Sequence, residues 1–356
     1  MEHEHTDRLQ DSFKGSCSAR QVTDTIERAA KNVIPDVTIT KIPVADGGEG
    51  TVDALVAAMK GTKVSVPAHD PLGRPITAEY GLLPDGSAVI ETAAASGLTL
   101  LKPEERDALH ASTFGTGELI RHALEHRVKK IILGLGGSAT TDGGAGLAGA
   151  LGISFLDKDG KELEPGGVHL RELASISTDG LLREAAGCEF LVACDVKNHL
   201  CGALGAATVF GPQKGADEEQ VKILDAALAH YAAVLKDKLH CAAADTDGSG
   251  AAGGLLCGIL PYFPVTICSG IDLVLDLTDF DEHVKQADLV ITAKDGLTSS
   301  PRWEKFLSVS RNAQKKSGMF RWLPSPGRKA TDAKRFIISG SMRSSTRFRA
   351  SCHWRM

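Results

Sequence analysis

The chain has 356 residues, 42% of them hydrophobic, and a formal net charge of −5. This length suffices for two domains with buried cores, and the negative charge argues against a general nucleic-acid binder. No run of roughly 18 apolar residues is present and residues 1–10 are polar, so we expect neither a membrane span nor a secretory signal. The eight cysteines are scattered without a Cys-x-x-Cys pair, which predicts reduced thiols and a cytoplasmic location.

The first predicted elements form a helix and then a strand–turn–helix unit. Residues 18–33 place apolar side chains at helical spacing, which predicts an amphipathic helix with Ser18 as its N-cap. Residues 37–44 alternate as a strand and are followed by a glycine-rich turn that contains Asp46 and Glu49. A second helix is predicted over residues 52–59. The two carboxylates therefore stand in the turn of a strand–turn–helix unit.

Residues 63–95 change to short alternating apolar runs. The runs are separated by Asp-Pro-Leu-Gly at residues 70–73 and Pro-Asp-Gly at residues 84–86, which are turn and hairpin signals. We therefore expect an antiparallel or mixed sheet in this region. A helix over residues 113–125 then leads to the next strand.

The most informative stretch is residues 131–152, a short apolar run, a glycine-rich turn over residues 136–144 and a small-residue helix. This arrangement directs free backbone N–H groups toward an anion, so it predicts binding of a phosphate or a carboxylate. A tight strand–helix connection whose glycines serve only packing is equally compatible with the pattern. Neither a Walker A motif nor Gly-x-Gly-x-x-Gly is matched in full.

Further candidate elements follow in the second half of the chain. A buried strand over residues 190–195 ends at Asp195, and Lys214 stands before a strong amphipathic helix over residues 218–239. Residues 248–254 form another small-residue turn, and residues 287–292 a last buried strand. After residue 293 the pattern breaks into a basic segment that holds all three tryptophans, which indicates disorder, a basic tail or a chain read out of its native frame.

Six blocks, in order, resemble the bacterial-type (class I) glycerate kinase family. They are residues 11–16 (Asp-Ser-Phe-Lys-Gly-Ser), 44–51 (Val-Ala-Asp-Gly-Gly-Glu-Gly-Thr), 136–144 (Gly-Gly-Ser-Ala-Thr-Thr-Asp-Gly-Gly), 193–196 (Ala-Cys-Asp-Val), 209–216 (Val-Phe-Gly-Pro-Gln-Lys-Gly-Ala) and 250–254 (Gly-Ala-Ala-Gly-Gly). The resemblance implies transfer of the γ-phosphoryl group of ATP to a hydroxyl of D-glycerate with Mg²⁺. It also implies two α/β domains with the active site in the cleft between them.

Both ends depart from the family pattern. The family begins with an apolar strand that is missing here, and it carries a Gly-Glu-Gly-Arg-Leu-Asp block where this chain has Ala-Lys-Asp-Gly-Leu-Thr at residues 293–298. Codons for residues 3–9 and 293–299 can spell the family's strand and its Glu-Gly-Arg-Leu-Asp when read one frame over, so we hypothesise shifted reading frames. A truly diverged tail is the alternative, and the nucleotide sequence distinguishes the two.

Phosphoryl transfer needs cations on the phosphates, a metal held by carboxylates and a base near the attacking hydroxyl. Candidate catalytic residues are Lys14, Asp46 and Asp195; candidate cofactor-binding residues are Gly136, Gly137, Ser138, Asp142, Gly143, Lys214 and Gly253; candidate metal ligands are Asp195 and Asp142. Each has a structural alternative. The lysines could be surface residues, Asp46 and Asp142 helix N-caps, Asp195 a turn residue and Glu49 a first-turn partner of the helix dipole.

The sequence thus predicts an α/β fold with two domains. A Rossmann-like parallel-sheet domain would comprise residues 1–64 and 271–356, with a mixed-sheet α/β domain over residues 65–270 inserted in it. The predicted function is ATP-dependent phosphorylation of D-glycerate, favouring 2-phosphoglycerate, by a possible homo-oligomer without nucleic-acid or membrane partners. A non-catalytic nucleotide or carboxylate binder with damaged termini is the alternative; a dehydrogenase is disfavoured because no complete dinucleotide-binding fingerprint is present.

Overall fold

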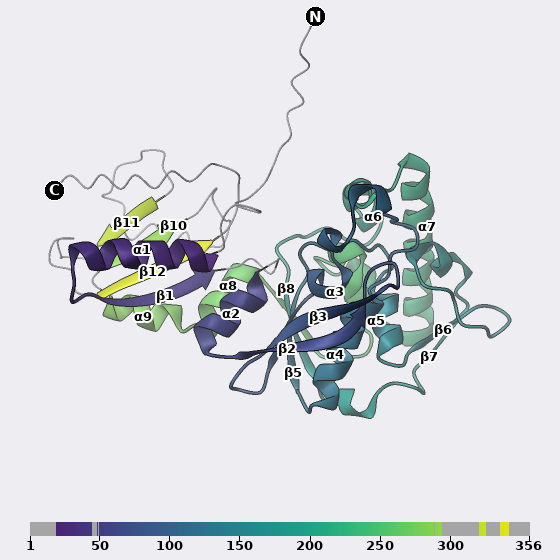
Figure 1. Ribbon diagram of the computed structural model, residues 1–356. Coiled ribbons are helices and arrows are strands. Elements are labelled where there is room, and N and C mark those ends of the chain that lie inside the picture. The colour runs from purple at the N-terminus through teal and green to yellow at the C-terminus, as the bar shows by residue number, and fades with distance from the viewer. Residues whose placement is uncertain are drawn as a thin grey trace, which may run out of the picture. The chain divides into compact units, whose positions relative to one another are not determined.

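A computed structural model describes residues 19–44, 48, 50–287, 289–293, 320–324 and 335–341 (Figure 1). The chain divides into two compact units, one formed by Met1–Ala45 with Leu275–Met356 and the other by Asp46–Val274. Over the described part of the chain, no helix is both long enough and apolar enough to cross a membrane. The predicted α/β class is confirmed, because each unit combines helices with a largely parallel sheet.

The smaller unit contains a four-stranded sheet in the order β1-β12-β10-β11. Its strands are β1 (Thr38–Val44), β10 (Leu289–Ala293), β11 (Phe320–Pro324) and β12 (Arg335–Ser341), and its helices include α1 (Ala19–Val33) and α9 (Phe280–Gln286). β12 is parallel to both β1 and β10, whereas β11 pairs antiparallel with β10. Two strands therefore form within the basic segment in which the sequence pattern breaks.

Helix α1 packs along β1 and β12 through its apolar face (Figure 1). Ala30 from the helix, Val37 ahead of β1 and Ile291 from β10 form the buried centre of this unit. On the exposed side, the Lys41 ammonium lies 2.6 Å from Asp24 and 2.7 Å from Glu27, which joins the strand to the helix. The helix predicted over residues 18–33 is confirmed from residue 19 onward.

The larger unit is built on a six-stranded sheet in the order β2-β3-β4-β5-β8-β9. Its strands are β2 (Thr62–His69), β3 (Pro75–Leu82), β4 (Ala88–Glu91), β5 (Lys130–Gly134), β8 (Glu189–Ala193) and β9 (Val265–Cys268), with a separate hairpin of β6 (Ser154–Leu156) and β7 (Ser175–Ser177). The pairs β4–β5, β5–β8 and β8–β9 are parallel, and β2–β3 and β3–β4 are antiparallel. The mixed sheet predicted after residue 63 is confirmed.

The two predicted turns of this sheet form because aspartates satisfy their backbone. The Asp70 carboxylate accepts hydrogen bonds from the backbone N–H groups of Leu72 and Arg74, both at 2.9 Å. The Asp85 carboxylate accepts from the N–H of Ser87 at 3.0 Å. Such aspartate turns fix the chain reversal and hence the register of the hairpins.

Three helices of the larger unit pack on the strands of the sheet, namely α2 (Thr51–Met59), α3 (Ala93–Ser96) and α4 (Phe114–Glu125). Helix α5 (Ala145–Ala150) packs on α4, and α6 (Ala206–Phe210) packs on α7 (Glu218–Leu239); α8 (Gly270–Leu277) follows β9. The bounds of α7 are those predicted. The helix begins in a capping box, in which the Asp217 carboxylate accepts from the Glu219 and Gln220 N–H groups and the Gln220 side chain accepts from the Asp217 N–H.

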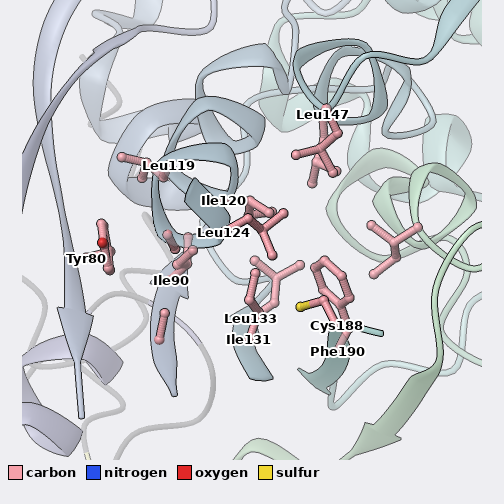
Figure 2. Packing of buried hydrophobic residues seen from close by; sticks show 14 of the residues in the cluster. Tyr80, Ile90, Leu119, Ile120, Leu124, Ile131, Leu133, Leu147, Cys188 and Phe190 are labelled. Carbon is pink, nitrogen blue, oxygen red and sulfur yellow. The ribbon is translucent and has the colours of Figure 1, made fainter. Parts of the chain in front are cut away.

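One hydrophobic core lies between the parallel strands and helix α4. Figure 2 shows Ile131 and Leu133 of β5 facing Ile120 and Leu124 of α4, with Phe190 of β8 beside them. All five side chains are at most 1% exposed. A second cluster forms around α7 and includes the buried Tyr231. These cores hold rigidly the ends of β4, β5 and β8, from which the candidate site extends.

Candidate functional site

Four neighbouring strands of the larger unit end at the same edge of the sheet. β4, β5, β8 and β9 run parallel, so the segments that follow Glu91, Gly134, Ala193 and Cys268 all leave at their carboxyl ends. In open α/β sheets, ligands bind outside this edge. The candidate residues Gly136, Gly137 and Ser138 lie in the segment after β5, and Asp195 lies in the segment after β8.

The glycine loop, residues 136–144, is attached to the segment that follows β4. The Leu98 N–H donates to the Gly137 carbonyl at 2.8 Å, and the Ala139 N–H donates to the Ser96 carbonyl at 2.9 Å. Gly137 has a φ of +77°, and a Cβ there would lie 3.1 Å from the Ala93 side chain. Glycine is favoured at this position because the backbone is left-handed and α3 is close.

Three successive amides at the start of the glycine loop remain available. Within the described residues, the backbone N–H groups of Gly136, Gly137 and Ser138 donate to no protein acceptor. Gly137 is exposed and Gly136 is half-buried, whereas the Ser138 side chain is held inward by a 2.9 Å hydrogen bond with Thr140 Oγ1. Unpartnered amides on a rigid loop at a strand end are what an anion-binding loop presents.

Asp142 fixes the second half of the loop. Its carboxylate is 1% exposed and accepts from the Thr113 N–H and hydroxyl, both at 2.8 Å, from the Gly144 N–H at 3.1 Å and from the Gly146 N–H at 3.2 Å. Burial raises the pKa of this carboxyl, and the four hydrogen bonds oppose that rise. In this geometry Asp142 joins the loop to the starts of α4 and α5, whose N-cap positions are Thr113 and Gly144 rather than Asp142.

Lys214 lies behind the same loop and is not a surface lysine. It ends the short helix η5 (Pro212–Lys214), is 2% exposed, and its Nζ donates to the Thr140 carbonyl oxygen at 2.5 Å. Burial lowers the pKa of the ammonium to about 7, and the negative charge of Asp142 opposes this shift. The lysine thus holds a loop carbonyl from inside the protein.

The small-residue turn around Gly253 completes this support. The Gly143 N–H donates to the Gly253 carbonyl at 3.0 Å. Gly253 has a φ of +69°, and a Cβ there would overlap the Thr140 carbonyl oxygen. The structure therefore brings the glycine loop, Lys214 and Gly253 together, although they are far apart in sequence.

Asp195 lies apart from that support, in the segment after β8. The residue is exposed, and its Oδ1 accepts from the N–H of Gly270, the first residue of α8, at 3.1 Å. Lys14, Asp46 and Glu49 lie outside the described residues. Gly48 and Gly50, in the turn before α2, are described. In α2 itself, the N–H of Val52 donates to Glu91 Oε1 at 2.6 Å.

Sequence reasoning missed Glu91. The available signal was a glutamate directly after the apolar residues 88–90. These three residues are fully buried in β4, and Glu91 is its last residue. Its partner stands 39 positions earlier, and such a distance leaves no local pattern.

The comparisons with known proteins agree on one family. A sequence model described as the glycerate kinase family matches residues 9–319. Glycerate kinase of Bacillus subtilis strain 168 is 47% identical over 290 residues, which cover 81% of this chain and 76% of that protein. Glycerate 2-kinase of Escherichia coli K12 is 44% identical over 290 residues, with the same coverage of 81% and 76%.

This chain belongs to the glycerate kinase family. Its fold agrees: a crystal structure of a protein assigned as glycerate kinase 2 from Salmonella typhimurium LT2 matches with a TM-score of 0.79 and 40% identity, covering 93% of this chain and 85% of that one. Membership makes the chain a kinase, and confirms the family predicted from the six sequence blocks.

The carboxylates of this glycerate kinase family member differ in what they could hold. No group of three His, Cys, Asp or Glu side chains with metal-binding geometry occurs in the described ranges. A metal at Asp142 would have to displace the donors that fill its carboxylate. Mg²⁺ in kinases is held by one or two carboxylates together with phosphates and water, and the exposed Asp195 suits that donor set better.

Proposed function

We propose that this protein phosphorylates D-glycerate with ATP and Mg²⁺, and that 2-phosphoglycerate is the product. The observation that carries the proposal is the row of unpartnered amides at Gly136, Gly137 and Ser138, at the carboxyl edge of parallel strands in a chain of the glycerate kinase family. The name of the Escherichia coli relative, glycerate 2-kinase, supports the 2-phosphate. The free thiols of the described cysteines suit a reducing compartment such as the cytoplasm.

In this proposal the glycine loop binds phosphate oxygens through its backbone. Gly136, Gly137 and Ser138 would donate N–H groups to the phosphates, and Gly143 and Gly253 would keep the loop in shape by their contact. Lys214 adds positive charge behind the loop and holds the Thr140 carbonyl away from the anion. Asp142 holds the other end of the loop through the hydrogen bonds it accepts from Ser112, Thr113, Gly144 and Gly146.

The remaining roles in this proposal fall to residues outside the glycine loop. Asp195 would hold Mg²⁺, which neutralises charge on the transferring phosphoryl group when bound. Asp46 and Asp195 are the candidates for the base that removes the proton of the glycerate hydroxyl, and Lys14 for the cation that binds the glycerate carboxylate or a phosphate.

The test is release of ADP that requires both ATP and D-glycerate. Enolase added alone to the products reports 2-phosphoglycerate through formation of an enol phosphate that absorbs in the ultraviolet, whereas 3-phosphoglycerate gives no signal without a mutase. ADP release without the enolase signal would overturn the 2-phosphate. Nucleotide binding without any ADP release would instead favour the non-catalytic alternative.

Variants test the assigned residues. Lys14→Ala and Asp195→Ala should each abolish turnover and leave the far-UV circular dichroism spectrum unchanged, because both are assigned to reacting groups rather than to the core. Near-native rates in both variants would refute the proposed site.

A further inference from the structure

Glu91 stands where two parts of the larger unit meet. It is the last residue of β4, is only 9% exposed, and its Oε1 accepts the Val52 N–H at 2.6 Å. Val52 is the second residue of α2, so its N–H is one of the four that the helix cannot satisfy by itself. The carboxylate therefore satisfies a helix donor from 39 positions away in the sequence.

Helix α2 depends on this outside partner because its own N-cap provides none. Gly50 occupies that position with a φ of +93°, and it has no side chain to accept a helix N–H. A carboxylate at the first turn also faces the positive end of the helix dipole. Glu91 thus replaces the missing cap and ties α2 to the end of β4.

The contact also fixes what precedes α2. The Thr51 N–H and hydroxyl both donate to the Gly48 carbonyl, at 3.2 Å and 2.7 Å, so Gly48 is held to the start of the helix. Glu91 is followed by Thr92, whose N–H donates to the Gly134 carbonyl at 2.9 Å. One short path of hydrogen bonds therefore connects the start of α2, the end of β4 and the end of β5.

We propose that Glu91 is a positioning residue, which fastens the start of α2, five positions after Asp46 in the sequence, to the ends of β4 and β5, from which the glycine loop extends. This inference rests on the proposed function, in which Asp46 acts on the acceptor hydroxyl and the loop binds phosphate. Removing the anchor lets the start of α2 move relative to the glycine loop, and a misplacement of about 1 Å at a reacting group can reduce turnover about 100-fold.

Two substitutions separate positioning from chemistry. Glu91→Ala removes the acceptor, whereas Glu91→Gln keeps an oxygen that can accept the Val52 N–H. We expect Glu91→Ala to lower kcat about 100-fold with the KM for ATP changed less than twofold, and Glu91→Gln to stay within about fivefold of the wild-type kcat. A Glu91→Gln variant as inactive as Glu91→Ala would overturn the proposal, because the charge itself would then be required.

Amide hydrogen exchange tests the anchor independently of activity. In Glu91→Ala, the first turn of α2 should exchange at least tenfold faster, while peptides from α4 and β5 keep the wild-type rate. Unchanged exchange in α2 would overturn the inference whatever the kinetics. If the wild type shows no glycerate-dependent ADP release but α2 still responds, the proposed function fails while the anchor stands.

Asp85 provides the matched control at the opposite end of β4. Its carboxylate also accepts a backbone N–H, from Ser87 at 3.0 Å, but it faces the hairpin to β3. Asp85→Ala should leave both kcat and the exchange of α2 as in the wild type. Equal effects of Asp85→Ala and Glu91→Ala would show general destabilisation and overturn the assignment.

Discussion

Replacing Lys214 by methionine tests the charge behind the glycine loop. The substitution keeps the length and apolar stem of the side chain but removes an ammonium that is 2% exposed. It also removes the hydrogen bond to the Thr140 carbonyl, a loss of about 1–3 kcal/mol that does not depend on pH. The dependence of the stability difference on pH therefore isolates the buried charge.

The direction of that dependence follows from the pKa of Lys214. Burial lowers it to about 7 from an ordinary 10.5, so between these values the unfolded state holds a proton that the folded state has lost. The free energy of unfolding of the wild type must then rise with pH, at about 1.4 kcal/mol per unit. From pH 7.5 to 9.0 the wild type should gain about 2 kcal/mol relative to Lys214→Met. Well below pH 7, both states are protonated and the difference no longer changes with pH.

Tyrosine absorbance provides the assay. All three tyrosines, Tyr80, Tyr231 and Tyr262, lie in the unit of Asp46–Val274, whereas all three tryptophans lie after residue 293. Urea unfolding followed by second-derivative tyrosine absorbance therefore reports the unit that contains Lys214. Lys222→Met on α7 is the control, since its side chain is 73% exposed and should show no pH-dependent difference. A flat difference for Lys214→Met as well would refute the lowered pKa of Lys214.

Three further predictions concern the packing of the larger unit. Gly253→Ala should destabilise the larger unit by more than about 2 kcal/mol in urea unfolding, because its Cβ would overlap the Thr140 carbonyl, whereas Gly149→Ala, with open space at its Cβ, should not destabilise it. Asp142→Ala should cost more than about 3 kcal/mol by stranding buried donors; a loss below about 1 kcal/mol would contradict the hydrogen-bond set. The Cys188 thiol, buried and with its pKa raised to about 11, should react with a thiol reagent at pH 8 only after unfolding.

Local patterns predicted the elements whose stability is local. The bounds of α7 follow from its apolar spacing and its capping box, which involve neighbours within one or two turns. The hairpins of β2, β3 and β4 follow from Asp70 and Asp85, whose carboxylates bond backbone only two to four residues away. The short strands β6, β7 and β9 were not predicted, since three or four residues carry too little periodicity.

The sequence by itself determined the α/β class, the family and the glycine loop as the place to look, because turn chemistry and ordered motifs lie within a few residues of each other. Only the tertiary structure decided that Lys214 is buried against Thr140, 74 positions away, and that Glu91 caps α2. A lysine beside a glycine looks the same in sequence whether it faces water or a carbonyl. The difference arises when strands from distant segments align and exclude water, which changes both the contacts and the pKa of the ammonium.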